Sequence, residues 1–261
     1  MERFQRNDQA WILTGAAFIF LVVVLFLLTS ANRPQGSMMP EGHHHHQGMS
    51  MMSEEPLSPA VQAKLLADKK ESEFNHHLAG FFVLVAGAFM LFQGVLIKRW
   101  PLAKYVWPAC FLLSGIFVLI WSDTELWPFG HRQWLEALQN NPEVLQHKLF
   151  ALLLLGLGAI EWQRVRGVLQ AAWSHWVYPV VAIAGSILVL FHHHEGGMQG
   201  PQHMAVMSRI QLQHSSFAAT GICLGLVKGL AETKESLQVS LQKVWPMFMI
   251  VLGVLLMFYR E

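Results

Sequence analysis

The segment 191–214, FHHHEGGMQGPQHMAVMSRIQLQH, joins two apolar runs that are each long enough to cross a bilayer. It holds five histidines, three methionines and one glutamate in 24 residues. The glycines of 195–200 predict a turn, so the histidines at 192–194 close one helix and Pro201 opens the next. The segment therefore predicts a helical hairpin whose connecting turn carries potential metal ligands.

Three side chains of the second helix have the spacing of a single helical face. His203, Met207 and His214 stand at i, i+4 and i+11, which 3.6 residues per turn brings into one stripe. Imidazole and thioether groups from this stripe would meet the histidine cluster that ends the preceding helix. That ligand mixture favours copper, especially Cu(I), over zinc or a hard cation.

The whole chain has the composition of a membrane protein. Of its 261 residues, 53% are hydrophobic and only 13% are charged, well below the charged fraction usual in soluble domains. The formal net charge is +1 and no basic face with interleaved aromatics occurs, which excludes nucleic acid as a partner. The sequence also has no phosphate-binding glycine loop, nucleophile elbow, HExxH pair or CxxC pair, so hydrolase and nucleotide-binding functions have no support.

Seven apolar runs predict an all-α polytopic bundle of about seven transmembrane helices. The first run, 11–29, is expected to be a retained anchor, with a cleaved signal peptide as the alternative. The residues 58–261 are expected to form a six-helix bundle, with Ser58 and Pro59 starting its first helix and 140–143 another. Its spans are predicted at about 77–97, 105–121, 149–160, 176–192, 210–231 and 245–259. Glycines recur every seven residues on the first of these, at Gly80, Gly87 and Gly94, and predict close helix contact.

Between the anchor and the bundle, the segment 30–57 contains the run GHHHHQGMSMM. It has no periodicity and cannot bury a core, so it is predicted to be a mobile outer tether. The tether is expected to collect metal and pass it to the helical site, the alternative being low-complexity filler.

Lysine and arginine are denser in the segments that would be inside if the amino terminus were cytoplasmic. This topology places every histidine except His175 on the outer side, together with most methionines of the loops. The expected location is therefore the bacterial inner (plasma) membrane, with a site that faces the periplasm.

Four predicted spans carry histidine at their outer ends, where unpaired polar groups are costly. We expect His147, His203 and His214 to form the core of a metal site. The next candidates are His77, His192 and Met207, and then His76, His193 and His194. Carboxylates such as Asp123, Glu125, Glu143 and Glu195 are candidates to orient these imidazoles. The alternative is a set of interfacial histidines, each bonded to water or a loop carbonyl.

The segment VLQHKLFALLLLGLG at 144–158 is similar to the histidine-bearing helix of Caa3-type oxidase assembly proteins. The layout of several spans with outer-facing histidines resembles the bacterial copper-resistance D membrane family. The resemblance is local to the surroundings of His147 and of 203–214. It implies a role in copper handling.

The expected function is therefore copper binding at the outer face, in copper uptake, delivery or tolerance. Its partners would be the copper ion, membrane lipid, and a periplasmic copper chaperone or a membrane complex. One alternative is a membrane cytochrome in which two histidines ligate haem b, although methionine-rich loops have no clear role in it. Another is a structural subunit of a larger membrane complex.

Overall fold

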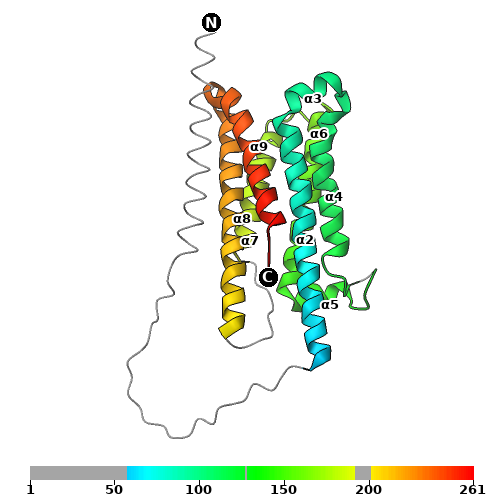
Figure 1. Cartoon of the computed structure of the whole chain (residues 1–261). Coiled ribbons are helices and arrows are strands. Elements are labelled where there is room, and N and C mark those ends of the chain that lie inside the picture. Colours follow the sequence, from blue (N-terminus) through cyan, green and yellow to red (C-terminus); the bar gives the residue numbers. More distant parts are fainter. Residues whose placement is uncertain (1–57, 127, 192–200) are drawn as a thin grey trace, which may run out of the picture.

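A computed structural model of the chain describes residues 58–126, 128–191 and 201–261 (Figure 1). These ranges are helical and contain no β-strand, which confirms the all-α prediction for the described residues. The elements in chain order are α2 (Pro59–Leu91), α3 (Gln93–Arg99), the 3-10 helix η1 (Pro101–Tyr105), α4 (Val106–Trp121), α5 (Trp134–Asn140), α6 (Pro142–Val165), α7 (Ser174–Leu190), α8 (Pro201–Thr233) and α9 (Glu235–Met257).

Six long helices close into a ring in the order α2, α9, α8, α7, α6, α4. Neighbouring helices are antiparallel: Gly80 faces Leu256 while Gly87 faces Met249, so α2 and α9 run in opposite directions. The ring therefore has two ends (Figure 1). We call them the α5 end, where α2, α6 and α8 begin, and the α3 end, where these three helices finish.

Four of the described helical segments are long and apolar enough to span a membrane: Pro59–Leu91, Pro101–Trp121, Pro142–Val165 and Ser236–Met257. The helix α7 is apolar but shorter. The predicted run 11–29 lies outside the described residues. Large apolar side chains are exposed on every helix of the ring, as expected where lipid covers the surface. Examples are Phe81, Leu113, Leu152, Val180, Leu226 and Val254.

The helix α8 falls outside the apolar set because it places polar side chains inside the bundle. His214, Ser216 and Thr220 are buried near its middle and Lys228 is buried nearer its end. Ser216 and Thr220 each donate to the carbonyl four residues earlier, at 2.8 Å, so their hydroxyls are satisfied within the helix.

Two predicted helix starts are confirmed by their caps. The hydroxyl of Ser58 accepts from the N–H of Val61 at 3.4 Å, and Oδ1 of Asn141 accepts from the N–H of Val144 at 3.1 Å. The helix that begins at Pro59 runs into the predicted span 77–97 as expected, with a break near its end: α2 ends at Leu91 and α3 follows as a separate short helix. Gly94 lies beside this break, and glycine lowers helix propensity.

The predicted glycine contacts are confirmed at two of the three positions. An added Cβ at Gly80 would lie 2.7 Å from the carbonyl oxygen of Gly253, and one at Gly87 would lie 2.9 Å from Cβ of Met249. These contacts hold α2 tightly against α9. Gly94 has open space around its Cβ direction, because it lies beyond the end of α2.

Toward the α3 end, the ring is filled by aromatic side chains. Trp107 of α4, Tyr178 of α7 and Trp245 of α9 are buried, with ring centroids 5.3–6.5 Å apart. This aromatic cluster therefore joins three helices, no two of which are neighbours in the ring.

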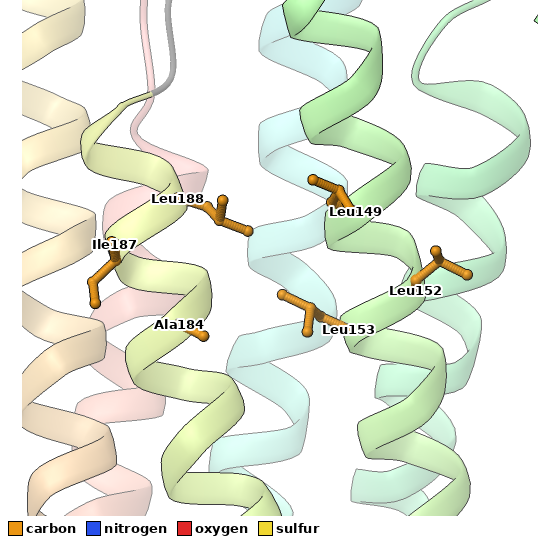
Figure 2. A pocket seen from close by; sticks show the side chains of 6 residues that line it. All are labelled: Leu149, Leu152, Leu153, Ala184, Ile187 and Leu188. Atoms are coloured by element: carbon orange, nitrogen blue, oxygen red, sulfur yellow. The ribbon is translucent and has the colours of Figure 1, made fainter. Parts of the chain in front are cut away.

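The seam between α6 and α7 is more open than this core. An apolar groove of about 460 Å³ lies there. Figure 2 shows the side chains that line it. It is lined by Leu149, Leu152, Leu153, Ala184, Ile187 and Leu188. Such an apolar surface suits lipid acyl chains.

Candidate metal site and buried charge networks

The described histidine side chains are sorted between the two ends of the ring. His175 begins α7 at the α3 end, whereas the others lie toward the α5 end. Those others are His76, His77, His131, His147 and His214. The antiparallel ring therefore brings histidines from three long helices to the same end.

Two of these imidazoles lie beside each other inside the bundle. The rings of His76 on α2 and His214 on α8 have centroids 5.8 Å apart and planes inclined by 68°. His214 is buried and His76 is half-buried. Nδ1 of His76 lies 2.8 Å from the carbonyl oxygen of Ser72, and Nδ1 of His214 lies 3.0 Å from that of Ile210.

These backbone contacts select one tautomer for both imidazoles. A carbonyl oxygen only accepts, so Nδ1 carries the proton and Nε2 carries the lone pair of the neutral ring. Histidines that ligate metals are commonly oriented in this way, by a hydrogen bond from the other ring nitrogen. The pair therefore has the tautomer that Nε2 ligation requires.

Aromatic rings surround the pair. Tyr259 stacks on His76 with a centroid distance of 3.8 Å, and Phe217 lies 5.7 Å from His214 and 6.2 Å from Tyr259. His77 uses Nε2 to donate to the carbonyl oxygen of Tyr259 at 3.0 Å. The residues after α9 thus close the space between α2 and α8.

Polar contacts fix this closing segment in place. Oε1 of Glu261 accepts from the hydroxyl of Ser72 at 2.7 Å and from that of Tyr259 at 2.9 Å. On the α8 side, Gln213 exchanges hydrogen bonds of 2.8 and 2.9 Å with the backbone of Arg260. Burial, followed by the nearby Glu261 carboxylate, raises the pKa of the Tyr259 hydroxyl above its usual range, so this group remains a protonated donor.

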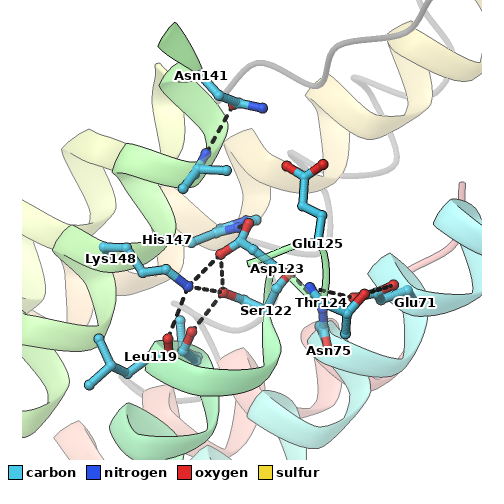
Figure 3. A network of polar contacts seen from close by, with 12 residues as sticks. Glu71, Asn75, Leu119, Ser122, Asp123, Thr124, Glu125, Asn141, His147 and Lys148 are labelled. Carbon is cyan, nitrogen blue, oxygen red and sulfur yellow. Dashed lines mark hydrogen bonds and ion pairs between the residues drawn. The ribbon is translucent and has the colours of Figure 1, made fainter. Parts of the chain in front are cut away.

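A second polar network at the α5 end contains His147 (Figure 3). Nδ1 of His147 lies 2.9 Å from Oδ1 of Asp123, while Oδ2 of Asp123 accepts from Lys148 and from Ser122, both at 2.6 Å. Burial alone would raise the pKa of Asp123, but His147, Lys148 and Ser122 together hold it below its ordinary value. Asp123 thus contacts the imidazole of His147, as one of the carboxylates predicted to lie beside the histidines.

The ring order separates His147 from the imidazole pair. The helix α6 packs against α4, α5 and α7, whereas α8 packs against α7 and α9. His76, not His147, is therefore the imidazole beside His214, because α2 and α8 both border α9. Among the described residues, no three His, Cys, Asp or Glu side chains converge as a metal site.

Several predicted ligands cannot be placed against this pair. His203 belongs to α8, but its side chain lies outside the described residues, as do His192, His193 and His194. Met207 is described and half-buried, on α8 between His203 and His214. His214, the last residue of the predicted stripe, is buried at the imidazole pair.

The α3 end contains a charge network that was not predicted. Glu161 is only 2% exposed and binds Arg164 through both oxygens, at 2.8 and 3.0 Å. His175 lies between Arg164 and Glu232, and Glu232 pairs with the buried Lys228. The signals in the sequence are the i, i+3 and i, i+4 spacings of opposite charges inside apolar stretches.

Comparison with known proteins gives no match: no family model fits the chain, and no curated protein or solved structure is similar to it. The resemblance to copper-handling families therefore stays a prediction. Any functional assignment has to rest on the two polar ends of this bundle and on the chemistry of their side chains.

Proposed function

We propose that the protein is an integral membrane copper-binding protein that takes copper at its α5 end and acts in copper uptake, delivery or tolerance. The observation that carries the proposal is the inner pair, His76 and His214. These imidazoles come from different helices, lie side by side, and are both set by the backbone for ligation through Nε2.

Chain connectivity supports a copper function at this end. The His/Met segment 30–57 leads into Pro59, and the segment 192–200 joins Phe191 to Pro201. The described helix ends where these segments attach all lie at the α5 end (Figure 1). Thioether and imidazole groups together favour Cu(I). A copper ion collected by these segments would meet Met207 and then the inner pair along α8.

The side chains around the pair fit a single ion better than haem. A bis-histidine haem needs a flat macrocycle between its two axial ligands. Here Phe217 and Tyr259 pack against both imidazoles, and Tyr259 stacks directly on His76. Because a macrocycle would have to displace these rings, copper is the better candidate and the cytochrome is the alternative.

The membrane orientation forms part of the proposal. The connections at the α3 end carry Lys98, Arg99, Lys104 and Arg166. The positive-inside rule then makes the α3 end cytoplasmic and the α5 end periplasmic in a bacterial inner membrane. In this orientation α7 and α8 also cross the bilayer, and the apolar run 11–29 adds a seventh span with a cytoplasmic amino terminus.

Copper binding by purified full-length protein tests the proposal. Competition with a chromophoric Cu(I) chelator should show a loss of affinity of about tenfold or more for His76→Ala and for His214→Ala, since even groups that only orient metal ligands contribute on that scale. His131→Ala is the matched control, because His131 is exposed in the loop after α4. Wild-type affinity in the His76/His214 double variant would refute the inner pair as the site.

Two further measurements separate the alternatives. Deletion of 38–52 should slow copper loading from dilute metal but leave the final copper content unchanged; if it abolishes binding while His214→Ala does not, the tether is the whole ligand system. A Soret band that shifts on reduction would instead assign the protein as a cytochrome. Binding of neither copper nor haem would favour the structural subunit.

A further inference from the structure

The charged side chains at the α3 end form one connected group, which we call the α3-end cluster. It joins three helices, with two residues from α6, one from α7 and two from α8. Its members are Glu161, Arg164, His175, Lys228 and Glu232. Charged groups at such positions in a membrane bundle are costly, so they are candidates for function.

The contacts of His175 create a conflict at a single nitrogen. Nδ1 of His175 lies 2.8 Å from Nη2 of Arg164 and 2.7 Å from Oε2 of Glu232. Arg164 can only donate, and an ionised Glu232 can only accept. If Nδ1 carries a proton, it satisfies Glu232 but opposes the N–H of Arg164. If Nδ1 is bare, it satisfies Arg164 but directs its lone pair at the carboxylate.

One added proton resolves the second arrangement. When the carboxyl of Glu232 is protonated, its O–H can donate to a bare Nδ1 instead of repelling it, while Arg164 directs an N–H toward the same nitrogen. The other carboxyl oxygen of Glu232 remains paired with Lys228, whose ammonium lies 4.6 Å from the ring centroid of Trp245. The cluster therefore has two arrangements that differ by one proton, and adding that proton removes the repulsion between the Nδ1 lone pair and the carboxylate.

The cluster also has a route to solution. The side chain of His175 is 45% exposed, whereas those of Glu232 and Lys228 are 9% and 7% exposed. Nδ1 faces the buried partners, so the opposite edge of the ring lies on the exposed side. His175 thus stands between water at the α3 end and a buried carboxylate.

We propose that the α3-end cluster is a proton-binding site in which His175 relays a proton between the solution at the α3 end and Glu232. In the uptake step, Nε2 of His175 accepts a proton from water or buffer, and Nδ1 passes its own proton to Oε2 of Glu232. The imidazole ends neutral in its other tautomer, and the carboxyl ends neutral and donates to Nδ1, toward which Arg164 also directs an N–H. One proton enters and no electron moves.

The charged groups that face this pair come from both neighbouring helices. From α6 they are Glu161 and Arg164, and from α8 Lys228 stands beside Glu232. On α7 itself, Tyr178 is buried one turn from His175. The site needs no copper, so its test is independent of the function proposed above.

Infrared difference spectra of the full chain, recorded between about pH 3 and 9 so that both the carboxyl and the histidine ranges are covered, test the relay. We expect a carboxylic acid C=O band to appear as pH falls, together with imidazole bands that report a change of tautomer. Glu232→Gln should remove the carboxyl band. His131→Gln, which alters an exposed histidine at the other end, should leave both signals unchanged.

A second variant keeps the test decisive if Glu232→Gln does not fold. His175→Gln alters a half-exposed side chain and leaves Glu232 paired with Lys228. In this variant the carboxyl band should shift its midpoint by about one pH unit, the scale of a nearby titrating partner. A carboxyl band that survives Glu232→Gln, or a midpoint unmoved by His175→Gln, would overturn the proposal and leave the cluster as a packing device.

Discussion

The buried pair of Asp123 and Lys148 provides the sharpest test of how the α5 end is held together. Both side chains are only 7% exposed, and their charged atoms are 2.6 Å apart. The ammonium of Lys148 also donates to the carbonyl oxygen of Leu119 at 3.0 Å and to the hydroxyl of Ser122 at 3.3 Å (Figure 3). Its three protons thus have three acceptors.

Replacing only one partner should therefore be costly. Asp123→Asn leaves the Lys148 ammonium buried without its counter-charge, which should cost about 3 kcal/mol of unfolding free energy. Lys148→Met should cost less, about 2 kcal/mol, because His147 and Ser122 still face the carboxylate. The double variant removes both charges, so its cost should fall short of the sum of the two by about 1–3 kcal/mol.

Reversible unfolding in mixed detergent micelles, followed by the loss of helical circular dichroism, measures these values. Glu125→Gln is the matched control, because Glu125 pairs with Arg132 at 2.8 Å in the same loop, where the two side chains are 50% and 34% exposed. That change should cost less than about 1 kcal/mol. An Asp123→Asn variant as stable as the control, or strictly additive effects in the double variant, would refute the account of Lys148 as a buried charge that depends on Asp123.

Three further predictions use the same unfolding measurement. Gly80→Ala should cost about 1–3 kcal/mol of unfolding free energy, because the new Cβ meets the backbone of α9. Gly94→Ala has open space around the new Cβ, so it should be neutral or stabilising by up to about 1 kcal/mol. Equal effects of the two changes would contradict the close contact at Gly80. Asn141→Ala should cost about 1 kcal/mol through loss of the α6 cap, and no change would remove that role. The lowered pKa of Asp123 means that its stabilisation is complete above its unfolded value of about 3.9 and is lost as pH falls through the folded value. Wild type should therefore lose stability in acid more steeply than Asp123→Asn, and parallel curves would show that this carboxylate does not contribute.

Features set by short stretches of sequence could be predicted. Ser58 and Asn141 mark helix starts because a cap acts within three residues of its own position. The gathering of histidines at one end follows from alternating helix direction, which needs no knowledge of which helices are neighbours. The role of Asp123 beside His147 was among the predicted carboxylate contacts because both belong to that same end.

The partner of each side chain could not be predicted, because it depends on the order of helices around the ring. From the sequence alone, either His76 or His147 could lie near His214. The structure decides for His76, because α2 and α8 both pack against α9. Arg164, His175 and Glu232 belong to three helices and are separated by long stretches of chain, so their charges looked like ordinary inner-end residues. Neither the periodicity of apolar residues nor a sequence motif gives information about contacts between different helices.

The helix α8 connects the two polar ends of the bundle. The polar side chains that it carries toward both ends make it less apolar than the other long helices. His214 and Glu232 are 18 residues apart (232 − 214), which corresponds to about 27 Å at 1.5 Å per residue. This length is close to the hydrocarbon thickness of a bilayer, about 30 Å. A spanning α8 would therefore keep the imidazole pair near one interface and the carboxylate near the other, where polar side chains cost least. Because its polar side chains gather toward the two interfaces, we expect α8 to cross the membrane despite its composition.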